Sequence, residues 1–91
     1  MYAVVVRVKV NDVERAQQAL ESEVVPQVSG APGFKAGYWT RATDGGDTNG
    51  LSMVVFDSEE NARAAAGRVR GMVPDTVTFE SVEVREVVAS A

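Results

Sequence analysis

The stretch Ala31-Pro-Gly-Phe-Lys-Ala-Gly-Tyr-Trp-Thr-Arg41 divides the chain into two halves of similar plan. Its Pro-Gly pair predicts a turn that ends the preceding helix and resets the backbone for an extended segment. The residues after this turn predict a strand, because aromatic residues are enriched in strands and successive side chains point to opposite faces. Regular alternation would place Phe34, Ala36, Tyr38 and Thr40 on one face and Lys35, Gly37, Trp39 and Arg41 on the other.

The half before this stretch begins with an alternating, valine-rich segment from Tyr2 to Val10, which predicts a strand. One face is wholly apolar (Tyr2, Val4, Val6, Val8, Val10), and the other carries Ala3, Val5, Arg7 and Lys9. A helix follows, with Asn11 as its expected N-cap and Glu14 at capping-box spacing. Its expected apolar stripe is Val13, Ala16, Leu20 and Val24. Pro26 is expected to end or kink this helix near Val25, since proline removes a backbone hydrogen bond and clashes with the preceding turn.

The half after it repeats the plan. Residues 42–50 are polar and glycine-rich, which predicts a hairpin loop, and residues 51–56 predict a short strand. The second helix is expected to start at Asp57 or Ser58 and to stop at Gly71, with Ala62, Ala65, Ala66 and Val69 facing the core. Residues 77–88 predict a last strand, and the spacing between Phe79 and Val82 breaks its alternation, which predicts a bulge or a bend.

The element order is therefore βαββαβ, which predicts an α+β fold of the ferredoxin-like type: one domain, residues 1–91, with a four-stranded antiparallel sheet and both helices on one face. The other face would carry Ala3, Val5 and Trp39, joined by Leu51, Met53 and Val55 if the register allows. A large apolar surface of this kind is typical of an interface. We therefore expect a homodimer that pairs through the open sheet face.

Composition narrows the function. The net charge is −4, which argues against a nucleic-acid partner, because such partners are normally met by a basic surface. Apolar runs are too short to cross a bilayer, and the first residues do not resemble a signal peptide, so we expect a cytoplasmic protein. The chain has neither cysteine nor histidine, which removes the commonest metal and haem ligands and the usual general base. No cofactor is expected.

Two motifs carry a resemblance to a known family: Pro-Gly-Phe-x-x-Gly-Tyr-Trp at residues 32–39 and Phe-Asp-Ser-Glu-Glu-Asn-Ala-Arg-Ala-Ala-Ala at residues 56–66. With these motifs, the whole chain resembles the dimeric α+β barrel superfamily and, within it, small bacterial proteins near the antibiotic biosynthesis monooxygenase domains. The resemblance implies a dimer and, among other activities, cofactor-free oxygenation. The best-known oxygenases of that family are associated with an Asn, a Trp and a His in one pocket. This chain has no histidine, so the resemblance does not supply a catalytic set.

The candidate ligand-binding residues are Trp39, Arg7 and Arg41, because an aromatic face stacks on flat ligands and guanidinium groups pair with carboxylates. The competing interpretation places Trp39 in the dimer core and both arginines at its rim. Each weaker candidate has a structural alternative. Tyr2 and Tyr38 are either phenolic acids or side chains buried on the helix side, and Asp44, Asp47 and Asn49 are either cation ligands or a solvated loop. Glu80, Glu83 and Glu86 are either a catalytic carboxylate group or charges at the edge of the sheet.

Three hypotheses for the function remain. The first is a small dimer that binds a small ligand, such as an aromatic one, without a catalytic set. The second is a cofactor-free monooxygenase with a pocket at Trp39. The third is a structural or interaction module.

Overall fold

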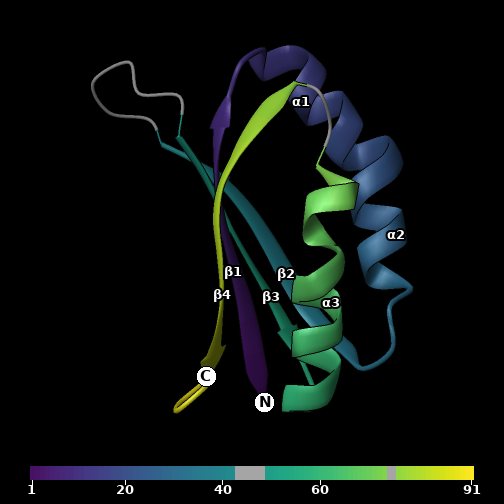
Figure 1. Ribbon diagram of the computed structural model, residues 1–91, viewed down its shortest axis with the longest axis vertical. Coiled ribbons are helices and arrows are strands. Elements are labelled where there is room, and N and C mark those ends of the chain that lie inside the picture. Colours follow the sequence, from purple (N-terminus) through teal and green to yellow (C-terminus); the bar gives the residue numbers. More distant parts are fainter. Residues whose placement is uncertain (43–48, 74–75) are drawn as a thin grey trace.

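The computed structural model (Figure 1) describes residues 1–42, 49–73 and 76–91. Its elements in chain order are β1 (Tyr2–Val10), α1 (Val13–Ala19), η1 (Leu20–Val24), α2 (Val25–Ser29), β2 (Phe34–Arg41), β3 (Asn49–Phe56), α3 (Glu59–Met72) and β4 (Val77–Glu86). The strands form one antiparallel sheet in the order β2-β3-β1-β4, and the helices lie together on one side of it (Figure 1). The predicted ferredoxin-like fold is confirmed. No helix among the described residues is both long and apolar enough to span a membrane.

The core lies where α3 rests on the two central strands. Val4 and Val6 of β1 and Val54 and Phe56 of β3 are buried there against Ala62, whose side chain is fully covered. The predicted stripe of small residues on α3 explains this close approach, because alanine side chains keep the helix near the sheet. Ser58 caps α3 as predicted, since its hydroxyl accepts a 3.2 Å hydrogen bond from the backbone N–H of Asn61.

The Pro-Gly turn joins the two halves of the chain at the start of α3. Gly33 has a φ of 78°, a conformation that L side chains rarely adopt, and a Cβ at this position would collide with the side chains of Asp57 and Asn61. Its carbonyl accepts a 2.9 Å hydrogen bond from the backbone N–H of Asp57. Asn61 Nδ2 donates to Asp57 Oδ1 at 2.8 Å, and this bond is the main reason that the pKa of Asp57 is lowered. Glycine is therefore required at this turn.

A bulge at Lys35 reverses the faces that regular alternation predicts for β2. Phe34 pairs with Phe56, but Ala36 already pairs with Val55, so Lys35 is an extra residue on this strand. Beyond the bulge, Trp39 packs against the helix-side core, whereas Tyr38 lies on the open face with 67% of its surface exposed. The expectation that Trp39 shares a face with Ala3 and Val5, and that Tyr38 faces the helices, is wrong for this reason.

The first helical segment also differs from the prediction. Asp12, not Asn11, is its N-cap, because Asp12 Oδ1 accepts a 3.1 Å hydrogen bond from the backbone N–H of Arg15. Of the two alternatives predicted for Pro26, the end of the helix near Val25 is not observed, because α2 continues through it. The backbone widens instead into the π-helical turn η1, where the N–H of Val25 reaches the carbonyl of Leu20, and α2 continues to Ser29. A π turn is one way for a helix to accommodate a position that cannot donate a regular hydrogen bond.

The predicted bulge in the last strand is confirmed. Arg7 pairs with Ser81 and Val8 with Phe79, which leaves Glu80 as the extra residue on β4. Its effect is to keep Phe79 and Val82 on the same side of the sheet, and both pack against the core. Arg70 of α3 covers the Phe79 ring, with its guanidinium carbon 4.9 Å from the ring centre.

The face of the sheet that turns away from the helices, called the open face here, is divided between apolar and charged halves. Tyr38 and Met53 are its exposed apolar residues, at 67% and 40%. On the β4 side, Glu83 Oε1 lies 3.0 Å from Arg85 Nε and 3.9 Å from Arg7 Nη2. Ala3 and Val5 between these halves are already buried within one chain. The exposed apolar area is thus narrower than the sequence predicts and is concentrated on β2 and β3.

Candidate functional site

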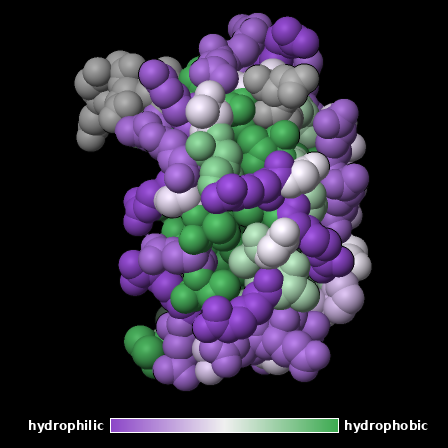
Figure 2. Space-filling model, viewed as in Figure 1, coloured by the Kyte–Doolittle hydropathy of each residue, from purple (hydrophilic) through white to green (hydrophobic). Residues whose placement is uncertain are grey.

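A cavity of about 840 Å³ separates the sheet from the first helical segment. Hydrophobic residues gather in the hollow between the strands and the helices, framed by hydrophilic residues on both sides (Figure 2). The lining is mainly aliphatic and consists, among others, of Val4, Val6, Val8 and Val10 from β1, Ala16, Leu20, Val24, Val25 and Val28 from α1 to α2, and Ala65, Val69 and Met72 from α3. Small-molecule sites are typically concave and mostly apolar, with volumes of about 300–1,000 Å³. This cavity is therefore the candidate site.

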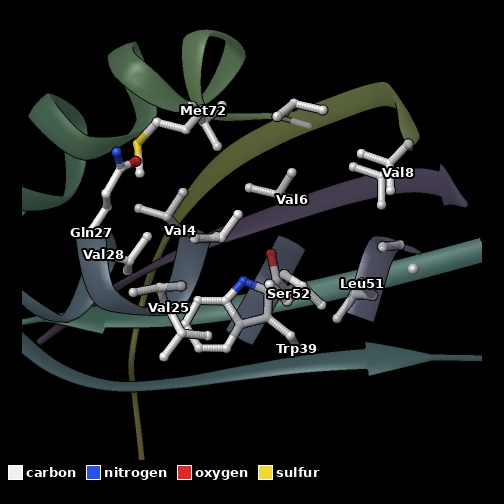
Figure 3. Close-up of a pocket in the computed structure, with 18 of the residues that line it drawn as sticks. Val4, Val6, Val8, Val25, Gln27, Val28, Trp39, Leu51, Ser52 and Met72 are labelled. Atoms are coloured by element: carbon white, nitrogen blue, oxygen red, sulfur yellow. The ribbon is translucent and has the colours of Figure 1, made fainter. Parts of the chain in front are cut away.

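The apolar face of β1 builds the floor of the cavity, and the two helical layers build its walls. α3 packs closely on the sheet through Ala62, whereas the stripe predicted for the first helix is only partly covered: Ala16 is buried, but Leu20 and Val24 are only half-buried. Figure 3 shows Val4, Val6, Val25 and Val28 around the same space as the Trp39 indole. The apolar residues of β1 and the first helical segment thus line the cavity instead of packing against one another.

Trp39 has a defined place in this cavity because Gly37 has no side chain. The two residues lie on the same side of β2, and a Cβ at Gly37 would be 2.8 Å from Cη2 and 2.9 Å from Cζ3 of the indole. The six-membered ring of Trp39 therefore lies back over the Gly37 backbone. Ser52 is the register partner of Trp39 on β3 and lines the cavity beside it (Figure 3).

A few polar groups interrupt the apolar lining. The Ser52 hydroxyl and the Trp39 indole N–H have no hydrogen-bond partner among the residues that the structure describes, and the same holds for the Gln27 amide, which Figure 3 shows near Met72. Ser52 and Trp39 are half-buried and Gln27 is exposed, so their polar groups are accessible to a bound molecule. Sequence reasoning missed Ser52 and Gln27. Ser52 could have been noticed in the sequence, because it is a polar residue on the helix-facing side of an otherwise apolar strand.

Three charged residues reach the lining: Arg41 at the end of β2, Arg68 on α3 and Glu21 on η1. Glu21 accepts a 3.3 Å hydrogen bond from Gln17 Nε2. Within the described residues, neither arginine takes part in an ion pair or hydrogen bond. The lining therefore has a formal charge of +1, from two arginines and one glutamate, in a chain whose net charge is −4.

The three residues proposed from the sequence are separated by the sheet. Trp39 and Arg41 both line the cavity. Arg7 lies on the open face near Glu83 and, with Arg41, borders a smaller pocket of about 290 Å³ at the end of the sheet. The structure thus brings Trp39 together with Arg41 and leaves Arg7 outside the cavity.

The weaker candidates do not gather at the cavity. Tyr2 packs on the helix side, but its hydroxyl donates to Glu86 Oε2 at 3.5 Å, and the negative charge of Glu86 is the main reason that the pKa of Tyr2 is raised. Glu83 is on the open face in its ion pairs. Asp44 and Asp47 lie outside the described residues. In the described ranges 1–42, 49–73 and 76–91, no three acidic side chains come together as a metal site.

Comparison with solved structures identifies proteins of the same architecture. SnoaB, a cofactor-independent oxygenase from Streptomyces nogalater, aligns over 98% of this chain and 94% of its own, with a TM-score of 0.73 and 16% identity. HapK from Hahella chejuensis aligns over 100% and 96%, with a TM-score of 0.69 and 13% identity. A dimeric ferredoxin-like protein from an uncultured marine organism aligns over 100% and 98%, with a TM-score of 0.66 and 13% identity.

The chain has the fold of these proteins. The resemblance to dimeric α+β barrel proteins that the two sequence motifs carry is confirmed at the level of the fold. Comparison with protein-family models gives no match, and neither does comparison with curated proteins.

The contact between Gly37 and Trp39 can be tested with a Gly37→Ala variant. The added methyl group would lie well inside the normal carbon–carbon separation of about 3.5–4.0 Å, so the indole must move. We expect a shifted fluorescence emission maximum, an altered near-UV circular dichroism spectrum, and a loss of about 1–3 kcal/mol in the free energy of unfolding. Because the chain has one tryptophan, its emission reports Trp39 directly.

Gly71→Ala is the control for this variant, since a Cβ at Gly71 meets nothing within 4 Å. It should leave both spectra unchanged. Identical spectra for Gly37→Ala and the wild type would contradict the placement of the indole over Gly37.

Proposed function

We propose that this protein binds a small ligand with a largely apolar body in the cavity between the sheet and the helices, in contact with Trp39. The observation that carries the proposal is a cavity of about 840 Å³ lined by aliphatic residues in a chain of only 91 residues. A chain of this size has little core to spare, so a hollow of this size on the apolar face of the central strand favours a binding role over a purely structural one.

The polar groups of the lining support an oxygen-bearing aromatic ligand. The Trp39 indole offers both a flat surface and an N–H donor, and Ser52 on the neighbouring strand offers a hydroxyl next to it. Aromatic rings pack well in offset or edge-to-face contacts with other rings. A carbonyl or hydroxyl group on such a ligand would satisfy donors that have no partner among the described residues.

Binding can be measured by titrating the protein with anthrone, a neutral three-ring ketone, while following Trp39 fluorescence. We expect saturable quenching and a raised melting temperature, because a ligand at 100 times its Kd stabilises the folded state by about 2.7 kcal/mol. Val6→Phe places a large side chain in the floor of the cavity and should weaken binding at least about tenfold, a loss of about 1.4 kcal/mol.

Val88→Phe makes the same substitution at a residue that is 87% exposed, and it should bind as the wild type does. Equal affinity in Val6→Phe and Val88→Phe would place the binding site elsewhere. The absence of quenching and thermal shift with anthrone, naphthoquinone and flavin alike would remove the proposal.

Cofactor-free oxygenation is a second candidate function. It is supported by the likeness of the fold to SnoaB, described as a cofactor-independent oxygenase, and by the mainly apolar lining of the cavity. For anthrone, the reaction would consume one O₂ and release anthraquinone and water, with the electrons supplied by the substrate. Trp39 N–H and Ser52 Oγ–H would donate hydrogen bonds to the substrate oxygen as it gains negative charge.

Oxygen uptake in the presence of anthrone tests this second function. We expect uptake above the rate of spontaneous oxidation, with equal amounts of O₂ consumed and anthraquinone formed, and a large decrease in Val6→Phe. Uptake that does not exceed the rate with heat-denatured protein, despite measured binding, would leave ligand binding as the function and exclude oxygenation of this substrate.

A homodimer through the open face is the proposed assembly. It is supported by the exposed Tyr38 and Met53 on that face and by the dimeric state of one structural neighbour. Aromatic residues and methionine are enriched in protein interfaces. The partner would cover the apolar half of the sheet without closing the cavity, which lies on the other side.

Light scattering at micromolar concentration should therefore give twice the mass of the chain. Tyr38→Glu should give a monomer, because the pairing would bury an unpaired charge. Val88→Glu introduces the same charge in the exposed C-terminal segment and should remain dimeric. A monomeric wild type would contradict the homodimer, and a different protein that co-purifies through this face would favour the interaction-module alternative.

A further inference from the structure

We propose that the ligand of the cavity is an anion, with a single carboxylate-like group that binds the Arg41 guanidinium while its apolar body lies against Trp39. This inference rests on the proposed function and adds the chemical class of the ligand. The apolar body can be aromatic or aliphatic, because the lining contains both Trp39 and many valines. Charge selectivity is the property that both kinds of ligand would share.

Arg41 is placed for this role by the strand that also carries Trp39. The two residues are separated by one position on β2, so they lie on the same side of the sheet at a spacing of about 6.6–6.8 Å along the strand. Gly50, the register partner of Arg41, brings no side chain to this end of the cavity. Its place is filled by the methyl groups of Val8 and Val10, since a Cβ at Gly50 would lie 3.0 and 3.5 Å from their Cγ2 atoms.

The β2–β3 side of the cavity therefore presents the Trp39 indole, the Ser52 hydroxyl on the paired strand, and Arg41 two residues further along β2 on the same side. A ligand that lies along these strands would meet a ring and a hydroxyl first and a positive charge last. A guanidinium group binds carboxylates through two parallel hydrogen bonds, which fixes orientation as well as adding affinity.

The charge of Arg41 has no partner within the described part of the chain, and this distinguishes it from several other arginines. Arg63 pairs with Glu59 at 3.0 Å, Arg85 pairs with Glu83 at 3.0 Å, and Arg70 lies over Phe79. Arg41 is exposed and borders both the cavity and the smaller pocket, where Arg7 and Glu80 are the other charged residues, so its guanidinium is accessible to an anionic group at the end of the cavity.

Two other charged residues border the cavity. Glu21 is on η1, in the helical wall, and already accepts a hydrogen bond from Gln17. Arg68 is on α3, in a different wall from Arg41. Because Arg41 shares a strand and a side with Trp39, we assign the recognition of the anionic group to Arg41, and Arg68 serves as the comparison.

Calorimetric titration with two matched pairs of compounds tests the proposal. The aromatic pair is anthracene-2-carboxylate and its carboxamide, and the aliphatic pair is dodecanoate and dodecanol. In at least one pair, the carboxylate should bind about tenfold more tightly than its neutral partner, as expected for one charge-assisted interaction at a partly exposed site. This ratio should decrease as salt is added.

In Arg41→Gln, the carboxylate and its neutral partner should bind with similar affinity, and the affinity of the neutral compound should be unchanged. Arg63→Gln makes the same change in net charge away from the cavity and should keep the wild-type ratio. Arg68→Gln should keep most of the wild-type preference for the carboxylate over its neutral partner. The pair that shows the selectivity identifies the ligand body as aromatic or aliphatic.

The contradicting outcomes are distinct. Neutral compounds that bind as tightly as both carboxylates would overturn the anionic ligand while leaving the proposed function intact. A selectivity that survives in Arg41→Gln but disappears in Arg68→Gln would overturn the assignment to Arg41. If none of the four compounds binds, this inference is overturned; the proposed function is then decided by the separate titrations with uncharged ring systems.

Discussion

The extra residue at Lys35 in β2 determines what this fold can do. A regular strand would turn Trp39 towards the open face, where it would belong to an interface between subunits. The bulge shifts the residues after Lys35 by one position in the pairing with β3, so Phe34 and Trp39 lie on the same side of the sheet. There the Phe34 and Phe56 ring centres are 6.4 Å apart, and the Trp39 indole lies over Gly37. A single inserted residue exchanges the two faces of the rest of the strand, because side chains alternate with a period of two. The aromatic surface of the cavity and the position of Arg41 both follow from that exchange.

Stability and binding are divided between the two helical layers. α3 packs its alanines against the sheet, where Ala62 and Phe56 belong to the buried core. The first helical segment contributes few contacts of that kind, and its apolar residues surround the cavity. The chain thus relies on α3 for its closest packing on the sheet, while both helical layers enclose the cavity. For a short chain, whose burial is limited by its surface, this division leaves the folded state dependent on the α3 side and on the turn at Gly33 that joins it to β2.

The sequence was sufficient for the fold and insufficient for the site. Alternation and helical periodicity gave β1, the α3 stripe and the break near Glu80, because each of these depends on neighbours in the sequence. The site depends on register: the sequence pattern alone did not reveal the bulge at Lys35, so Arg7 was grouped with Trp39 and the sheet separates them. Ser52 and Gln27 were missed because their importance comes from facing a cavity that no local pattern predicts. Trp39 and Arg41 were proposed as ligand-binding residues from their chemistry. The structure places both on the helix-facing side of the sheet, whereas regular alternation had placed them on the open face.

The π-helical turn before Pro26 has a consequence for exchange with solvent. The Val25 N–H bonds to the carbonyl five residues back, and Pro26 has no amide hydrogen. The Ser22 hydroxyl also donates to the Gln18 carbonyl at 2.7 Å. The regular series of helical backbone hydrogen bonds is therefore interrupted in this turn of the first helical segment. Segments with few buried contacts and interrupted backbone hydrogen bonds open at a lower free energy than packed core elements. Deuterium should therefore enter the amides of this turn before those of α3 or β1.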